Sequence, residues 1–237
     1  MLVRHLVPLP IRESANAVTG VVYGATYVLY GITLAFSLYL TNQEVSEARE
    51  TVEREATSLE GIFMIAEQLP QPERDRIQEL TESYARTVVE EEWPLMGRGA
   101  MSQESPQAEA LTDELQRSVV SFEPNTSAEQ ALYSQGITLA SDIEEEREIR
   151  LLYSHQDSHR LLWYVLVAGG VITVLNSLFF GTKALWLQGL SVASLTTVVV
   201  LLLSTTYQLQ APFTGSVRIE PEAFEEVLND IQKQREY

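Results

Sequence analysis

The run 18–40, VTGVVYGATYVLYGITLAFSLYL, decides the fold of this chain because it holds 23 residues without one charged side chain. About 20 apolar residues in a helix are enough to cross the roughly 30 Å hydrocarbon core of a bilayer. Two further runs of spanning length, 161–182 and 184–209, are also free of charge. The sequence therefore predicts an integral membrane protein with three transmembrane helices.

The segment 41–160, between the first two predicted spans, is strongly acidic. It carries a net charge of −16 out of −17 for the whole chain. Such a surface repels nucleic acid and anionic lipid, so neither is an expected partner. The chain has no cysteine, which excludes disulfides and thiolate metal sites. The predicted organisation is a short N-terminal segment, a span, an acidic soluble domain, two spans and a C-terminal segment, at 1–17, 18–40, 41–160, 161–182, 184–209 and 210–237.

Apolar residues at three- and four-residue steps predict that the soluble domain consists of helical hairpins without a sheet. In 43–69 such residues form an apolar stripe, and the helix of the first span is expected to continue through this segment. The stripe comprises Val45, Ala48, Val52, Ala56, Leu59, Phe63 and Ala66. Pro70 and Pro72 end the helix. A second helix is expected at 73–93 with Ile77, Leu80, Tyr84 and Val88 on one face, and a third around 108–122. The fold class is all-α: a membrane helical bundle with a helical-hairpin domain.

Two more helices are predicted from local signals. Ser127 and Gln130 fit a capping box that opens a helix running towards Arg160. Pro221 starts a short amphipathic helix near the C-terminus. Its apolar side holds Phe224, Val227, Leu228 and Ile231.

Basic residues near the membrane ends predict the orientation. Six arginines lie on the side of the soluble domain, against three basic residues on the other side, Arg4, Arg12 and Lys183. Lysine and arginine are enriched in cytoplasmic loops, whereas carboxylates contribute little to orientation. We therefore expect 41–160 in the cytoplasm and the protein in the inner cell membrane. The first 16 residues contain Pro8 and Pro10 and no long apolar core, so no signal peptide is expected.

Small and polar residues within the spans indicate contacts between helices. Gly20 and Gly24 form a GxxxG pair, which lets two helix backbones approach closely in lipid. Asn176 places an amide in the second span, where it is expected to hydrogen-bond to another helix or, alternatively, to line a wet path. The spans hold no charged residue, which argues against a proton-coupled transporter.

No residue pattern indicates an enzyme, a cofactor site or a metal site. His155 and His159 would share a helix face and could pair on a metal, but no third ligand stands at a fixed spacing. A position at the membrane boundary explains them more simply. The acidic run 142–148 lacks the glycine turn of a calcium loop and is interpreted as a solvated helix face.

Ile32, Phe36 and Leu40 repeat at four-residue spacing in the first span and form a strip of bulky apolar side chains. Contact with lipid or with a bundle core explains such a strip. The alternative is a hydrophobic constriction, which forms when the strip is repeated around an oligomer axis. Such a constriction gates by dewetting.

Several motifs resemble those of a known family. Gly31-Ile32-Thr33-Leu34-Ala35-Phe36, followed by Asn42 and Glu47-Ala48-Arg49, resembles the pore helix of bacterial bestrophins. The remaining motifs are similar to the bestrophin-like family of bacterial membrane proteins: Glu55-Ala56 with Leu59, Tyr84, Glu92-Trp93-Pro94 with Met96, Arg147, Arg150-Leu151 before Leu162-Trp163, and Leu209-Gln210-Ala211-Pro212-Phe213-Thr214-Gly215 before Pro221 and Phe224.

The resemblance implies an oligomeric channel. Bestrophins are pentameric anion channels, so it implies a homo-oligomer in the lipid bilayer that passes small anions such as chloride or bicarbonate, with a neck at Ile32, Phe36 and Leu40. A non-conducting scaffold or sensor whose acidic domain binds a partner protein is the alternative. Two features depart from the family: a span usually precedes the one at 18–40, and an acidic residue is common at the position of Gln210.

Overall fold

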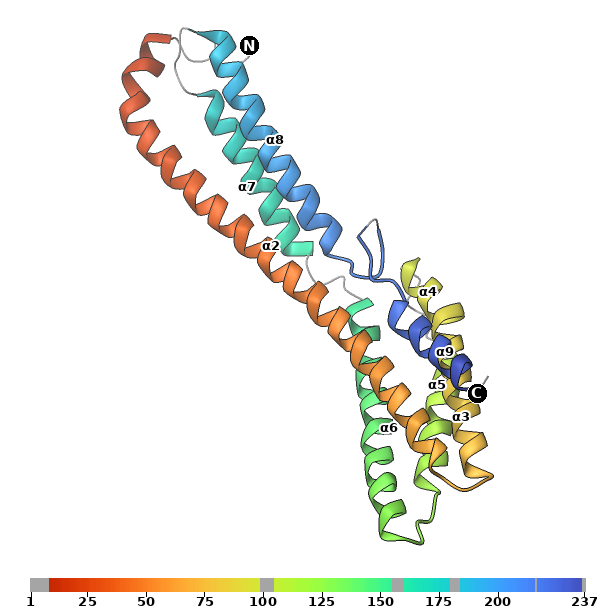
Figure 1. Cartoon of the computed structure of the whole chain (residues 1–237). Coiled ribbons are helices and arrows are strands. Elements are labelled where there is room, and N and C mark those ends of the chain that lie inside the picture. The colour runs from red at the N-terminus through yellow and green to blue at the C-terminus, as the bar shows by residue number, and fades with distance from the viewer. Residues whose placement is uncertain (1–8, 99–104, 155–159, 180–183, 216, 236–237) are drawn as a thin grey trace. The chain divides into compact units, whose positions relative to one another are not determined.

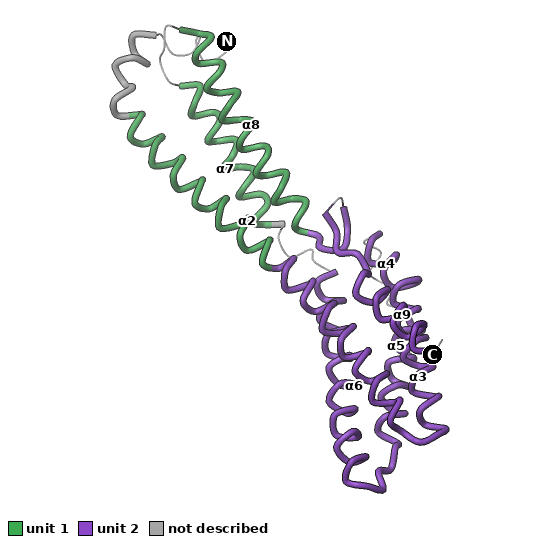
Figure 2. The backbone as a smooth tube through the Cα atoms, in the orientation of Figure 1, with its two compact units in different colours: residues 1–43, 157–210 green, residues 44–156, 211–237 purple. Residues whose placement is uncertain are grey.

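The computed structural model describes residues 9–98, 105–154, 160–179, 184–215 and 217–235, and Figure 1 labels their elements. All regular structure in these ranges is helical, as predicted. The elements in chain order are α2 (Leu9–Glu67), α3 (Glu73–Thr87), η1 (Val88–Glu92), α4 (Trp93–Gly97), α5 (Pro106–Val120), α6 (Ser127–Ser154), α7 (Arg160–Leu178), α8 (Leu185–Leu209) and α9 (Glu222–Arg235). The chain forms two compact units, residues 1–43 with 157–210 and residues 44–156 with 211–237 (Figure 2).

The first unit, called here the membrane unit, contains the N-terminal part of α2 together with α7 and α8. Three helical segments are long and apolar enough to cross a bilayer, Thr19–Ala66, Leu161–Leu178 and Leu185–Leu209. They overlap the three predicted spans, of which residues 180–182 lie outside the described residues, and α7 packs against α8. The fold is therefore an all-α membrane bundle.

The second unit, called here the domain unit, has one hydrophobic core that begins on α2. The predicted stripe on this helix is buried throughout, from Val45 to Ala66. On α3, the predicted face is buried as well, including Tyr84, which has no exposed surface. The three- and four-residue spacing therefore identified the core faces of both helices correctly.

The other helices of the domain unit cover this core. α5 packs on α3 and α6, and α9 packs on α3. The predicted apolar side of α9 faces inward, with Phe224, Val227 and Ile231 buried and Leu228 partly buried against the core. The C-terminal segment is thus an integral layer of the domain unit.

One expected helix contains a change of helix type. A single helix was expected over 73–93, but α3 ends at Thr87 and continues through the π-helical turn η1 into α4. The wider turn of a π-helix shifts the phase of the residues that follow it. Val88 and Glu92 are both buried within η1, and Trp93 and Met96 are buried in α4. The helix therefore directs a carboxylate and an aromatic ring into the core one after the other.

The N-terminal cap of α6 differs from the prediction by one residue. The Thr126 Oγ1 atom accepts a hydrogen bond from the Glu129 backbone N–H at 3.1 Å, and Glu129 Oε2 accepts one from the Asn125 backbone N–H at 2.6 Å. The predicted pair of Ser127 and Gln130 is wrong, since Ser127 is already the first helical residue. A threonine and a glutamate three residues apart satisfy the free N–H groups equally well.

Candidate functional site

The membrane part of α2 has an inward face that packs within the membrane unit. Leu34, Ser37 and Thr41 are at most 2% exposed. The Thr41 hydroxyl donates to the Ser37 carbonyl oxygen at 2.9 Å, which satisfies that polar group inside its own helix. At about 100° per residue, these three side chains share one face of the helix.

The predicted strip lies on a different face of the same helix turns, rotated by roughly 130° about the helix axis. Ile32, Phe36 and Leu40 are 61%, 60% and 41% exposed in the single chain. Nothing within the described chain covers this face. Exposed apolar side chains at four-residue spacing are suited to contact lipid, to contact a second copy, or to line a path between copies.

The glycines that allow close helix packing in the membrane unit are on α7. A Cβ atom on Gly169 would lie 2.7 Å from Tyr30 Cδ2, and one on Gly170 would lie 2.8 Å from the Tyr30 hydroxyl. The Tyr30 hydroxyl donates to the Leu166 carbonyl oxygen at 3.2 Å. The aromatic ring of α2 is therefore seated directly on the α7 backbone, a contact that only glycine permits.

Of the residues predicted to mediate helix packing, Gly24 makes no comparable contact within the described residues. A Cβ atom on Gly24 would meet nothing within 4 Å, and Gly20 is half-buried. Asn176 is half-buried as well. Close packing at the Gly20–Gly24 pair therefore requires a second copy and stays a prediction.

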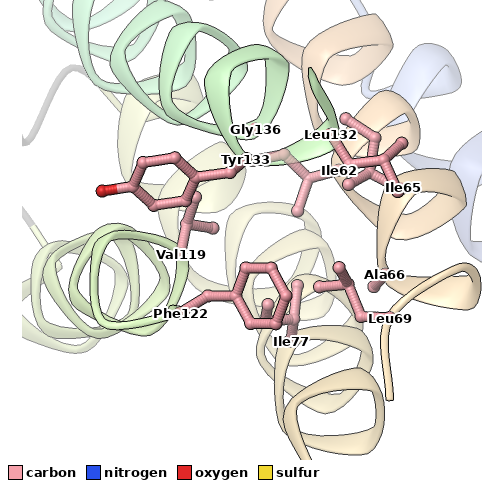
Figure 3. A pocket seen from close by; sticks show the side chains of 10 residues that line it. All are labelled: Ile62, Ile65, Ala66, Leu69, Ile77, Val119, Phe122, Leu132, Tyr133 and Gly136. Carbon is pink, nitrogen blue, oxygen red and sulfur yellow. The ribbon is translucent and has the colours of Figure 1, made fainter. Parts of the chain in front are cut away.

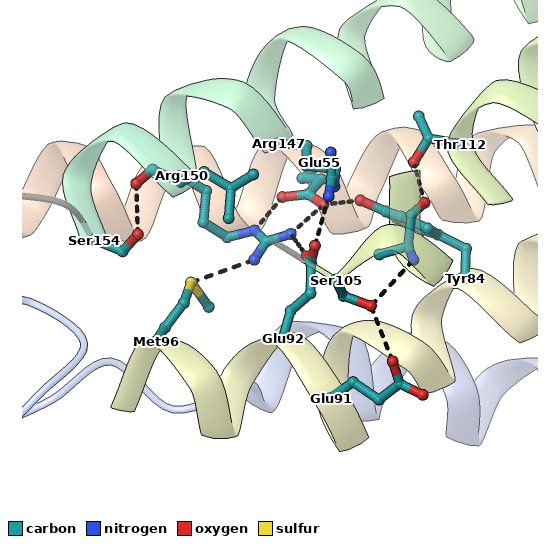
Figure 4. Close-up of polar contacts among 12 residues, drawn as sticks. Glu55, Tyr84, Glu91, Glu92, Met96, Ser105, Thr112, Arg147, Arg150 and Ser154 are labelled. Atoms are coloured by element: carbon teal, nitrogen blue, oxygen red, sulfur yellow. Dashed lines mark hydrogen bonds and ion pairs between the residues drawn. The ribbon is translucent and has the colours of Figure 1, made fainter. Parts of the chain in front are cut away.

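A network of buried charged residues lies in the core of the domain unit (Figure 4). We call it the buried charge network; its members are Glu55 of α2, Tyr84 of α3, Glu92 of η1, and Arg147 and Arg150 of α6. Each is at most 7% exposed. Four separate helical elements therefore meet at one point, three of them through charged side chains and α3 through the tyrosine hydroxyl.

Arg150 is the centre of the buried charge network. Its Nε and Nη2 atoms donate to the two oxygens of Glu55 at 2.6 and 3.1 Å, and Nη2 also donates to Glu92 Oε2 at 2.7 Å. Arg147 Nη2 donates to the other Glu92 oxygen at 2.6 Å. The Tyr84 hydroxyl donates to Glu55 at 2.5 Å. Two arginines and two glutamates balance in charge, which makes their burial tolerable.

The Glu92 carboxylate and the two guanidinium groups favour their ionised forms. Burial by itself would raise the pKa of Glu92, but attraction by Arg150 and Arg147 outweighs it and lowers that pKa. Burial would lower the pKa of Arg150, but Glu55 and Glu92 hold it well above its usual value. Burial and the neighbouring Glu55 raise the pKa of Tyr84, so it remains a neutral donor.

Aromatic rings enclose the guanidinium group of Arg150. Its Cζ atom lies 5.6 Å from the centroid of Trp93 and 5.8 Å from that of Phe224. Trp93 packs edge-on against Phe224 and Phe213, and its Nε1–H donates to the Ile219 carbonyl oxygen at 3.1 Å. The segment after α8 therefore closes the site from the C-terminal side.

The buried charge network was not predicted, although its residues carried a signal. Glu55, Tyr84, Glu92-Trp93, Met96, Arg147, Arg150, Phe213 and Phe224 were all quoted as separate family-like motifs, and they converge in this one cluster. Charged residues in amphipathic helices ordinarily face water. Periodicity placed Tyr84 and Phe224 on apolar faces, whereas the run 142–148, which contains the buried Arg147, was interpreted as a solvated helix face.

The apolar core cavity and the potential metal ligands are poor candidates for a binding site. An apolar cavity of about 10 Å³ lies among core residues such as Ile62, Phe122 and Tyr133, with room for little more than one water (Figure 3). No group of three potential metal ligands occurs in the described residues. His155 and His159 lie outside them.

Comparison with known proteins identifies the family. A search of curated proteins gives no match. Two solved structures of single-substitution variants of a bacterial bestrophin homologue from Klebsiella pneumoniae are similar in fold. One is 10% identical with a TM-score of 0.66, covering 99% of this chain and 96% of that chain. The other is 8% identical with a TM-score of 0.72, covering 98% of this chain and all of that chain.

The family model of the bestrophin-like domain matches residues 1–224, which is nearly the whole chain. The three apolar helices and the all-helical fold agree with that match. The chain is a membrane protein that belongs to the bestrophin-like family.

Proposed function

We propose that several copies of this chain assemble around an axis and pass small anions, such as chloride or bicarbonate, through a neck formed by Ile32, Phe36 and Leu40. The observation that carries the proposal is the exposure of these three side chains on a face of α2 distinct from its packed face. A subunit with three spans cannot enclose a path by itself, so conduction requires several copies.

A neck of this composition would act as a barrier. Rings of bulky apolar side chains cannot replace the hydration shell of an ion, so they oppose permeation unless the neck widens or becomes wet. The family supports an axial arrangement by analogy, since bestrophins are pentameric anion channels. A pentamer is accordingly the assembly that we propose.

The acidic charge of the domain limits where anions can pass. Negative walls repel anions, so surfaces facing the path must be locally neutral or basic. The buried charge network contributes no net charge, because its two glutamates are balanced by two arginines. We place the protein in the inner cell membrane with 41–160 in the cytoplasm, following the distribution of basic residues.

The test is anion flux into liposomes reconstituted with the Phe36→Ala variant. Truncation removes a whole ring of aromatic side chains from the neck, so we expect flux to rise at least severalfold over the native protein. Leu201→Ala is the matched control, because Leu201 is equally exposed but lies on α8. It should leave flux unchanged. Native or reduced flux in Phe36→Ala at equal assembly would contradict the neck.

A second candidate is a non-conducting scaffold whose acidic domain binds a partner protein. The observation that favours it is a hollow of about 380 Å³ between α5 and α6, walled by Glu109, Asp113, Glu144 and Glu148. Four carboxylates there favour basic side chains of a partner. Reconstituted protein that shows no flux in the native form and none in Phe36→Ala would support this candidate.

A further inference from the structure

Arg150 contacts both the first long helix and the C-terminal segment. Arg150 binds Glu55, which is on α2, through two hydrogen bonds. The same guanidinium group lies against Phe224, which is on α9. No direct α2 to α9 contact is needed for the two helices to influence each other, since Arg150 touches both.

The aromatic enclosure controls the strength of the ion pair. With Trp93 and Phe224 in place, Arg150 and Glu55 have no exposed side-chain surface. An ion pair in such a low-dielectric environment is far stronger than one in water. If α9 withdraws, water reaches the guanidinium group and the attraction that holds Glu55 weakens.

α2 is one continuous helix from Leu9 to Glu67, and it carries both Phe36 and Glu55. We propose that Arg150 is a positioning residue: the docking of α9 against Arg150 fixes the position of α2 through Glu55, so that the C-terminal segment controls the neck. Control of the neck rests on the proposed function. The coupling of α9 to α2 through Arg150 involves only residues of the domain unit.

The coupling is tested by a double-mutant cycle read by amide hydrogen exchange along α2 around Glu55. Phe224→Leu removes the ring from Arg150 but keeps an apolar side chain, and Glu55→Gln removes the charge that Arg150 binds. Each change should lower protection about tenfold, and the double variant should lose little more than either single variant. Lys233→Ala is the control, because Lys233 is exposed on α9 and pairs with Asp230 of the same helix, so its loss should leave the docked face of α9 intact.

Additive effects of Phe224→Leu and Glu55→Gln would overturn the coupling. The Lys233→Ala change should leave the protection of α2 unchanged and combine additively with Glu55→Gln, and non-additivity there would also overturn a specific role for Arg150. These outcomes do not depend on conduction. Arg150→Lys, which keeps the charge but loses the paired donors, should resemble Phe224→Leu.

Control of the neck is tested by anion flux in liposomes. Phe224→Leu should change flux by at least threefold in the native background and by much less in the Phe36→Ala background, where the barrier is gone. An equal change in both backgrounds, or none in either, would overturn control of the neck. If no variant shows flux, the proposed function fails, while hydrogen exchange still decides the coupling.

Discussion

The membrane unit and the domain unit place their polar groups in opposite ways. The membrane unit exposes bulky apolar residues such as Phe36 and buries hydroxyl groups. The Thr41 and Thr206 hydroxyls donate to carbonyl oxygens one turn earlier in their own helices. The domain unit buries four full charges, including Glu55 and Arg150.

The difference reflects the two solvents. In a bilayer, a hydroxyl group can satisfy its hydrogen bond within its own helix, so it can be buried without a partner on another helix. A carboxylate has no such option, and it is buried in the domain unit only because an arginine binds it there. Packing in the membrane unit is therefore tolerant of rearrangement, whereas the core of the domain unit depends on complete pairing.

The largest expected effect comes from breaking the buried charge network. Arg150→Ala leaves Glu55 and Glu92 buried without their main partner, which should cost about 3–5 kcal/mol of the free energy of unfolding. Urea unfolding of the detergent-solubilised protein, followed by circular dichroism, measures it. Arg54→Ala removes an exposed ion pair with Glu50 and should cost less than about 1 kcal/mol. Similar losses in both variants would refute the contrast between buried and exposed pairs.

The second effect is acid sensitivity confined to the domain unit. Because the pKa of Glu92 is lowered in the folded state, its contribution is present above the ordinary value of 4.5 and is lost as the pH falls through the lowered folded value. Hydrogen bonds to a charged group contribute about 1.5–3 kcal/mol, and protonation removes part of that amount.

Comparison of the native protein with Glu92→Gln tests this linkage. As the pH falls below about 4.5, the native protein should lose more stability than the variant, which has no proton to gain at this position. Hydrogen exchange should show the loss in the domain unit and little change in α7 and α8. Parallel pH curves for the two proteins would show that Glu92 does not carry the linkage.

The smallest expected effect concerns packing in the membrane unit. Gly169→Ala pushes a Cβ atom against the ring of Tyr30, and such overpacking costs about 1–3 kcal/mol. Gly24→Ala meets nothing within the chain and should leave thermal unfolding in detergent unchanged or slightly raised. If Gly24→Ala instead reduces the oligomer fraction in size-exclusion chromatography, the Gly20–Gly24 pair is a contact between copies.

Features set by local sequence were predicted well. Three charge-free runs of spanning length indicate three membrane helices, because length and apolarity alone meet the requirement of the bilayer. The stripe from Val45 to Ala66 and the apolar face of α9 were identified because helical periodicity is a local property. The motifs in 31–36 and 209–215 indicated the family that the comparison shows.

Only the tertiary structure could show which charges are buried and which glycines allow close packing. Glu55, Glu92 and Arg150 look like ordinary surface residues until four helical elements bring them together, and the π-helical turn η1 that aims Glu92 inward has no distinct sequence signature. The Gly169 contact depends likewise on where Tyr30 of a distant helix lies. Periodicity reports which face of a helix avoids its solvent, whereas pairing depends on distances between segments far apart in the chain.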